Sequence, residues 1–145
     1  MIAATVTIFG SYILFLYIRF GVLPSISESY YRLGKMNWLF TLFTWSLAAT
    51  IISNSTPLFF LSGACLAFVG AANAFKESMT STVHYIGAGG SIIASMAAFY
   101  FDYGLWWPAL FALVGSGLLV IVKNRIWWIE IYCFVVYSVA LNFKQ

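Results

Sequence analysis

Long apolar runs separated by short polar breaks make up this chain. Six runs have about the 17–20 residues that an α-helix needs to cross the hydrocarbon layer of a bilayer. They cover residues 2–20, 36–53, 57–75, 83–101, 105–122 and 126–143. Breaks this short force sequential helices to run antiparallel, as in an up-and-down bundle. The pattern therefore predicts an all-α, polytopic integral membrane bundle of six transmembrane helices that forms a single domain over residues 1–145.

The longest polar stretch, LPSISESYYRLGK at residues 23–35, interrupts this pattern after the first run. Ser25 followed three residues later by Glu28 matches the capping box that begins helices. Gly34 supplies the usual C-terminal stop. A short interfacial helix over residues 25–33 is therefore expected in the first loop.

Capping does not account for every polar side chain of this stretch. Arg32 and Lys35 are suited to lipid phosphates at the membrane surface. Ser27, Ser29 and the tyrosines beside them have no role in a cap, and some of them are expected to point into the mouth of the bundle.

Composition supports a lipid environment. Of the 145 residues, 63% are hydrophobic and 8% are charged, whereas soluble domains carry about 25% charged residues. The basic residues are not clustered on one soluble face, so the net charge of +3 does not indicate a nucleic-acid partner. Membrane lipids are the expected partners, and seams of small residues in the third and fourth runs allow homo-oligomers without requiring them.

The positions of the basic residues predict an orientation. Cytoplasmic loops are enriched in Lys and Arg, and six of the seven basic residues fall in or beside loops 1, 3 and 5. These six are Arg19, Arg32, Lys35, Lys76, Lys123 and Arg125. The expected location is a bacterial inner membrane, with loops 1, 3 and 5 in the cytoplasm and both termini outside.

The fourth run carries a stripe of small and polar residues at spacings of 4, 3, 4, 3 and 4, which place it on one helix face. Its members are His84, Ala88, Ser91, Ser95, Ala98 and Asp102. The stripe extends for roughly 27 Å at helical rise. One interpretation is tight packing against neighbouring helices, and the other is a polar cavity or water path along His84, Ser91, Ser95 and Asp102.

Ionisable residues gather at the predicted cytoplasmic ends of the helices. Glu130 lies about one turn inside the sixth run, where an ionisable group normally needs a partner. One hypothesis is a salt-bridge network formed by Arg19, Glu28, Glu77, His84 and Glu130. The other is a headgroup or anion site, for which the candidate binding residues are Arg19, Ser27, Glu28, Arg32, His84 and Glu130.

Catalytic and metal sites find little support. The chain has one histidine and neither CxxC nor HxxxH, so no metal and no cofactor are expected. Cys65 and Cys133 fall at mid-span depth and fit small buried hydrophobes. A serine of the first loop paired with His84 would be needed for a lipid hydrolase, but no GxSxG motif is present, and no catalytic residue is assigned.

Three short motifs resemble known membrane proteins. The segment LPSISESYY is similar to the P-x-I-S-[DE] that follows the first helix in Frag1/DRAM/Sfk1-type six-helix membrane proteins, VHYIGAGG is similar to their H-x-x-G-A, and GAANAFK is similar to the end of the preceding helix. Uncharacterised small bacterial membrane proteins share P-S-I-S-[DE]-x-Y-Y, G-A-x-x-x-F and V-H-x-x-G-A. The resemblance implies six spans and a role in membrane-lipid handling or organisation, without a defined reaction.

The leading expectation is a small, non-catalytic, multi-pass membrane protein that binds a lipid headgroup or other amphiphile at a cytoplasmic-side mouth. The first alternative is a channel or permeation protein that uses the face from His84 to Asp102. The second alternative is a membrane-embedded lipid hydrolase.

Overall fold

The computed structural model describes residues 2–72 and 77–143, with backbone alone for residues 77–81. Within these ranges the chain forms α-helices and one short 3-10 helix, and no strand occurs, which confirms the all-α class. The elements are α1 (Ile2–Phe20), α2 (Ser29–Arg32), η1 (Gly34–Met36), α3 (Trp38–Ile52), α4 (Pro57–Ala71), α5 (Glu77–Tyr103), α6 (Trp107–Leu119) and α7 (Arg125–Leu141).

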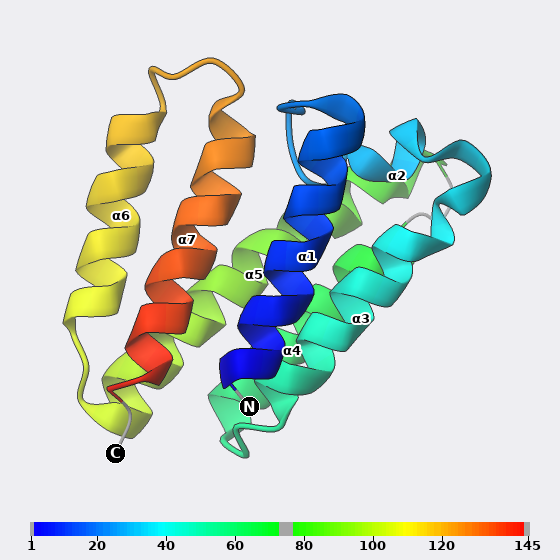
Figure 1. The fold of residues 1–145 in the computed structure, drawn as a ribbon. Helices are drawn as coiled ribbons and strands as arrows, with labels where there is room; N and C mark the ends of the chain where they lie inside the picture. The colour runs from blue at the N-terminus through cyan, green and yellow to red at the C-terminus, as the bar shows by residue number, and fades with distance from the viewer. Residues whose placement is uncertain (1, 73–76, 144–145) are drawn as a thin grey trace.

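The long helices run up and down in sequence order. The two ends of the chain lie at one end of the bundle, together with the α3–α4 turn and the α5–α6 connection (Figure 1). The polar segment around α2 and the α6–α7 loop lie at the opposite end. This arrangement agrees with the antiparallel order predicted from the short breaks.

The largest boundary difference is at α5. The segment KESMTST was predicted to be a break, but α5 begins at Glu77 and is 27 residues long, or about 40 Å at helical rise. The prediction was wrong because apolar periodicity does not report a polar helical turn. Residues 73–75, at the end of the third predicted run, lie outside the described residues.

The polar stretch after α1 also differs from its prediction. The helix expected over residues 25–33 is limited to the single turn of α2, after two turns closed by the carbonyls of Ile26 and Ser27. Half of the capping box is present, since the Glu28 amide donates to Ser25 Oγ at 3.2 Å. The Glu28 carboxylate instead pairs with Arg32 at 3.5 Å. Gly34 follows with a φ of +55°, the left-handed conformation expected of a helix stop.

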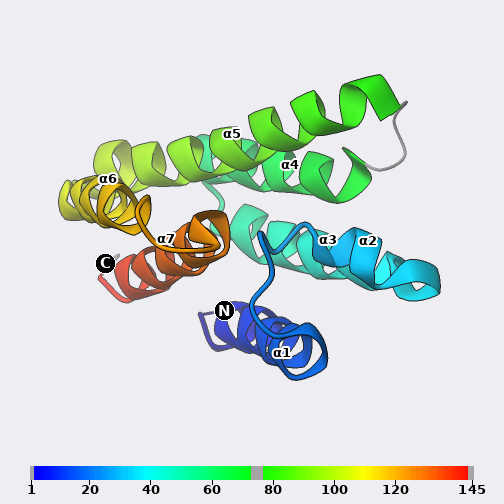
Figure 2. The same ribbon diagram turned by 90° about the horizontal axis from the view of Figure 1, so that it is seen from above.

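Small residues bring α4 into close contact with both of its neighbours, α3 and α5 (Figure 2). A Cβ on Gly63 would lie 2.8 Å from the Ala48 carbonyl of α3, and one on Gly87 would lie 2.9 Å from the Cys65 carbonyl of α4. Hydroxyls join the second seam, where Ser62 Oγ lies 2.8 Å from the Ser91 carbonyl. The three helices therefore form the most tightly packed part of the fold.

By contrast, α6 lies at the edge of the bundle and contacts α7 and α5. Its buried residues are Pro108 and Ala112, although its sequence WPALFALVGSGLL is apolar all round.

By length and apolar character, two helical segments of the described chain are suited to crossing a membrane, Ile2–Phe20 and Thr82–Tyr103. The shorter apolar helices are α4 and α6, so six spans do not follow from helix length alone.

The α3–α4 seam generates a stability prediction. A Cβ on Gly70 would overlap Thr44 Oγ1 and lie 3.0 Å from the Trp45 ring, whereas Gly10 on α1 has open space around it. We expect Gly70→Ala to destabilise the protein by about 1–3 kcal/mol through overpacking and Gly10→Ala to leave stability unchanged or raised. Thermal unfolding of both variants in the same detergent measures this, and equal melting temperatures would contradict the close approach.

Candidate functional site

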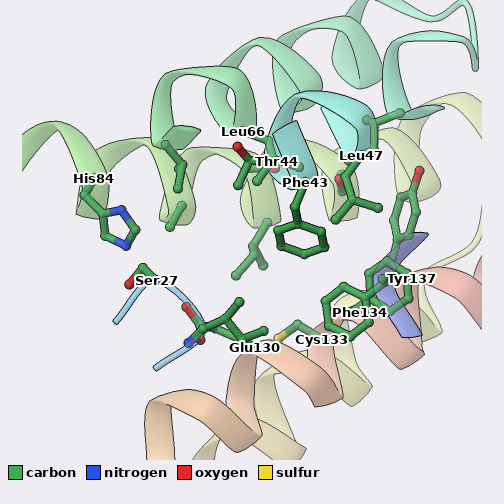
Figure 3. A pocket seen from close by; sticks show the side chains of 18 of the residues that line it. Ser27, Phe43, Thr44, Leu47, Leu66, His84, Glu130, Cys133, Phe134 and Tyr137 are labelled. Atoms are coloured by element: carbon green, nitrogen blue, oxygen red, sulfur yellow. Dashed lines mark hydrogen bonds between the residues drawn. The ribbon is translucent and has the colours of Figure 1, made fainter. Parts of the chain in front are cut away.

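A half-enclosed cavity of about 150 Å³ lies inside the bundle. Its walls come from α1, the segment before α2, α3, α4, α5 and α7. Phe43, Leu47 and Leu66 are among the apolar side chains that make up most of this wall (Figure 3). The cavity lies between the two buried apolar clusters of the molecule and is lined by members of both.

Polar side chains gather at one end of this cavity, which we call the mouth and define by Ser27, His84 and Glu130. His84 projects from α5 and Glu130 from the facing α7, with Ser27 on the segment between them (Figure 3). Tyr137 lies at the other end. The cavity is therefore polar at one end and mostly apolar along its body, where Thr44, Ser91 and Ser95 are the polar members of the wall.

A hydrogen bond between the first loop and α7 forms one side of the mouth. The Ile26 amide donates to Glu130 Oε2 at 2.6 Å. Ile26 and Leu23 are both buried, so this part of the loop packs into the bundle and does not lie along its surface. One oxygen of the Glu130 carboxylate is thus committed to holding the loop in place.

Two further hydrogen bonds hold the loop over the start of α7. The Trp127 amide donates to the Pro24 carbonyl at 3.3 Å, which satisfies one of the backbone N–H groups that a helix leaves free in its first turn. Asn124, in the left-handed conformation with a φ of 57°, donates from Nδ2 to the Val22 carbonyl at 3.2 Å. Sequence reasoning missed both bonds because each ends on a backbone carbonyl, which carries no residue-specific signal.

Ser29, which the cap left unexplained, points into the bundle. Its hydroxyl lies 2.8 Å from the Tyr12 hydroxyl of α1, and Ser29 is fully buried. Leu33 is buried as well, whereas Tyr31 is exposed. The loop is therefore fastened to α1 on one side and to α7 on the other.

The structure brings three of the six candidate binding residues to the cavity, namely Ser27, His84 and Glu130. The other three are Arg19, Glu28 and Arg32, which do not line it. Arg19 is exposed, with its guanidinium 5.5 Å from the centre of the Phe20 ring. Depth along the membrane axis was predicted for these residues, but the direction of each side chain was not.

The expected salt-bridge network does not form among the described side chains, whose one ion pair joins Arg32 to Glu28. The side chain of Glu77 lies outside the described residues. No described Lys or Arg lines the cavity, so the positive charge expected of an anion site is not found at the mouth.

The polar stripe of α5 divides into two parts. His84, Ser91 and Ser95 line the cavity, whereas Asp102 is exposed and lies outside it. Ser95 Oγ lies 2.6 Å from Ser62 Oγ of α4, and Ser91 contacts the same hydroxyl. These hydroxyls thus join two helices, as the packing interpretation expects.

The groups at the mouth are a carboxylate, a hydroxyl and an imidazole, which together can accept and donate hydrogen bonds. Ser27 Oγ lies 3.0 Å from Ser25 Oγ, and no hydrogen bond joins it to His84 among the described residues, so a nucleophile–base pair is not assembled. The described part of the chain contains no group of three His, Cys, Asp or Glu side chains that could hold a metal ion.

No family model, curated protein or solved structure matches this chain. Two segments that carry the resemblance noted above, LPSIS and VHYIGAGG, meet at the mouth through Ser27 and His84.

The buried contact between Tyr12 and Ser29 can be tested with a double-mutant cycle. Tyr12→Phe or Ser29→Ala alone leaves a buried hydroxyl without its partner, which costs about 1–3 kcal/mol. The double variant removes both hydroxyls and is expected to be more stable than the sum of the single changes predicts. Unfolding free energies of the four proteins measure the coupling, and strict additivity would show that the two hydroxyls do not interact.

Proposed function

We propose that this protein is a small, non-catalytic, six-span membrane protein that binds a lipid or other amphiphile in the cavity. The observation that carries the proposal is the distribution of polarity, with Ser27, His84 and Glu130 at the mouth and apolar side chains along the body. An amphiphile has the same distribution, so its head would lie at the mouth and its chain among Phe43 and Leu47.

Large apolar side chains on the outside of the bundle support the membrane part of the proposal. Five of them, from α1, α5, α6 and the α6–α7 loop, are between 71% and 91% exposed: Ile18, Ile93, Phe101, Leu113 and Ile121. Water-soluble monomers rarely leave large contiguous apolar patches uncovered. A lipid environment accounts for this exposure and for an apolar helix at the edge of the bundle.

The helix lengths fit a bilayer if the long helix tilts and the bilayer becomes thinner around the short helices. α3 and α4 have 15 residues each, or about 22 Å, which is short of a hydrocarbon layer of about 30 Å. The 27 residues of α5 exceed that thickness. Short spans are accommodated by local thinning and flanking residues, and long spans by tilting.

The basic residues support an orientation in which the mouth faces the cytoplasm. The described Lys and Arg side chains belong to the end of α1, the first loop and the α6–α7 loop, all at the mouth end of the bundle (Figure 1). They are Arg19, Arg32, Lys35, Lys123 and Arg125. Because Lys and Arg are enriched in cytoplasmic loops, this distribution supports a mouth on the cytoplasmic side.

Cysteine labelling of intact cells tests the spans and their orientation. In a chain with Cys65→Ser and Cys133→Ser, we expect a membrane-impermeant maleimide to label Ser53→Cys in the exposed α3–α4 turn. Lys35→Cys, exposed in the first loop, should be labelled only after permeabilisation. The opposite pattern would reverse the orientation, and equal labelling of both would contradict a membrane between them.

The cavity can be tested through Cys133, which lines it. In a Cys65→Ser chain, we expect decanol to slow alkylation of Cys133 by N-ethylmaleimide by several-fold, because the bound chain covers the thiol. Ala88→Phe places a ring into the cavity wall and is expected to abolish the protection. The control is Ile93→Phe, on the same helix at an exposed position, where protection should persist. Equal protection in both variants would contradict binding in the cavity.

A further inference from the structure

We infer that the amphiphile taken by this cavity has a single alkyl chain and a protonated primary amine as its head. The inference rests on the proposed function and deepens it by naming the ligand class. It is carried by the charge of the mouth, by its hydrogen-bonding atoms and by the size of the cavity.

The charge of the mouth is set by Glu130. Ionisable groups at membrane depth face the interior and pair with one another or with backbone. Glu130 Oε2 has the Ile26 amide, while no described side chain gives the carboxylate an ion pair or its second oxygen a hydrogen bond. The other titratable groups that line the cavity are His84, Cys133 and Tyr137, and none of them carries a fixed positive charge.

An anionic head fits this mouth poorly. A phosphate or carboxylate would bring a second acidic group beside the Glu130 carboxylate in surroundings of low polarity, where like charges repel strongly. The donors left for it are the Ser27 hydroxyl and one His84 ring N–H, because the Ile26 amide is already bonded to Glu130 and no described Lys or Arg lines the cavity. The headgroup site expected from Arg19 and Arg32 is therefore replaced by one of the opposite charge preference.

A primary ammonium has as many N–H donors as the mouth has acceptor groups. It has three N–H donors and no acceptor. The mouth offers three acceptors from three elements: the second carboxylate oxygen of Glu130, the hydroxyl of Ser27 and one ring nitrogen of a neutral His84. Figure 3 shows these side chains around one end of the cavity, with His84 and Glu130 on opposite walls. In the ion pair with Glu130, the ammonium supplies the positive charge that no described side chain provides at the mouth.

The size of the cavity limits the ligand to one chain. Its volume is about 150 Å³, similar to an engineered apolar cavity of about 150 Å³ that binds benzene. Sites for drug-sized ligands measure about 300–1,000 Å³. Two acyl chains do not fit, whereas part of one alkyl chain does, with the remainder leaving through the open side.

Three probes with the same chain test the head: decylamine, decanol and decanoate. The protein is the Cys65→Ser chain in nanodiscs of neutral lipid, and the readout is the concentration that halves the alkylation rate of Cys133. We expect decylamine to protect at about one-tenth of the decanol concentration, since a tenfold change corresponds to about 1.4 kcal/mol. Decanoate should need the highest concentration.

Glu130→Gln removes the charge while keeping an acceptor for the Ile26 amide. We expect the advantage of decylamine over decanol, both measured in the same variant, to fall to within about twofold. The matched control is Glu28→Gln, because Glu28 lies outside the cavity and pairs with Arg32. Glu28→Gln should keep the tenfold advantage. Because the probes partition into the lipid equally in both variants, the difference between Glu28→Gln and Glu130→Gln excludes partitioning as the cause.

The outcomes separate the two proposals. If decanol protects but decylamine has no advantage, or decanoate is the best probe, the amine assignment is overturned while the amphiphile site stands. Retention of the full advantage in Glu130→Gln would also overturn it. If none of the three probes protects Cys133, the proposed function itself fails. The comparison of the three probes does not need the Glu130→Gln variant. It therefore tests the preference of the mouth for an amine head even if Glu130→Gln does not fold.

Discussion

The contact between the Ile26 amide and the Glu130 carboxylate connects positions 104 residues apart and determines how the mouth is built. Without it, the first loop would have a buried amide without an acceptor, and burying such a group costs on the order of 1–3 kcal/mol. The same contact orients the carboxylate, since one oxygen is held by the loop and the other is left toward the cavity. The position of the loop and the acidity of the mouth thus depend on one side chain.

The rest of the bundle explains why a cavity remains beside this contact. Small residues let α4 approach α3 and α5 until backbone and side chain meet. On the opposite side, stacked rings join α1 to its neighbours, with Phe9 on Phe134 of α7 at a centroid distance of 3.6 Å and Tyr12 on Phe43 of α3 at 4.0 Å. The cavity lies where the tightly packed side and the aromatic side of the bundle meet.

Much of this arrangement could be predicted from the sequence, and the parts that could not share a physical cause. Apolar run length located the long helices, and the short helix of the first loop ended before Gly34, as expected. Helical rise also placed His84 and Glu130 at one depth, and both line the mouth. Rotation about each helix axis is not set by run length, which is why the direction of the Arg19 side chain could not be predicted. Asp102 shares a helix face with His84 but lies near the far end of α5, beyond the residues that line the cavity. Bonds that end on the carbonyls of Val22 and Pro24 depend on tertiary placement and leave no trace in residue type.

The docking of the first loop on α7 has a consequence for the order of synthesis. The loop leaves the ribosome early, yet the acceptor for the Ile26 amide is added 104 residues later. At about 5–20 residues per second, that interval is on the order of ten seconds. During that time α1 and its loop can pair with α3, through contacts such as Tyr12 on Phe43, but the mouth has only two of its three walls. The mouth is therefore complete only once α7 has been made, and a chain truncated before residue 130 would carry the loop and His84 without Glu130 opposite them.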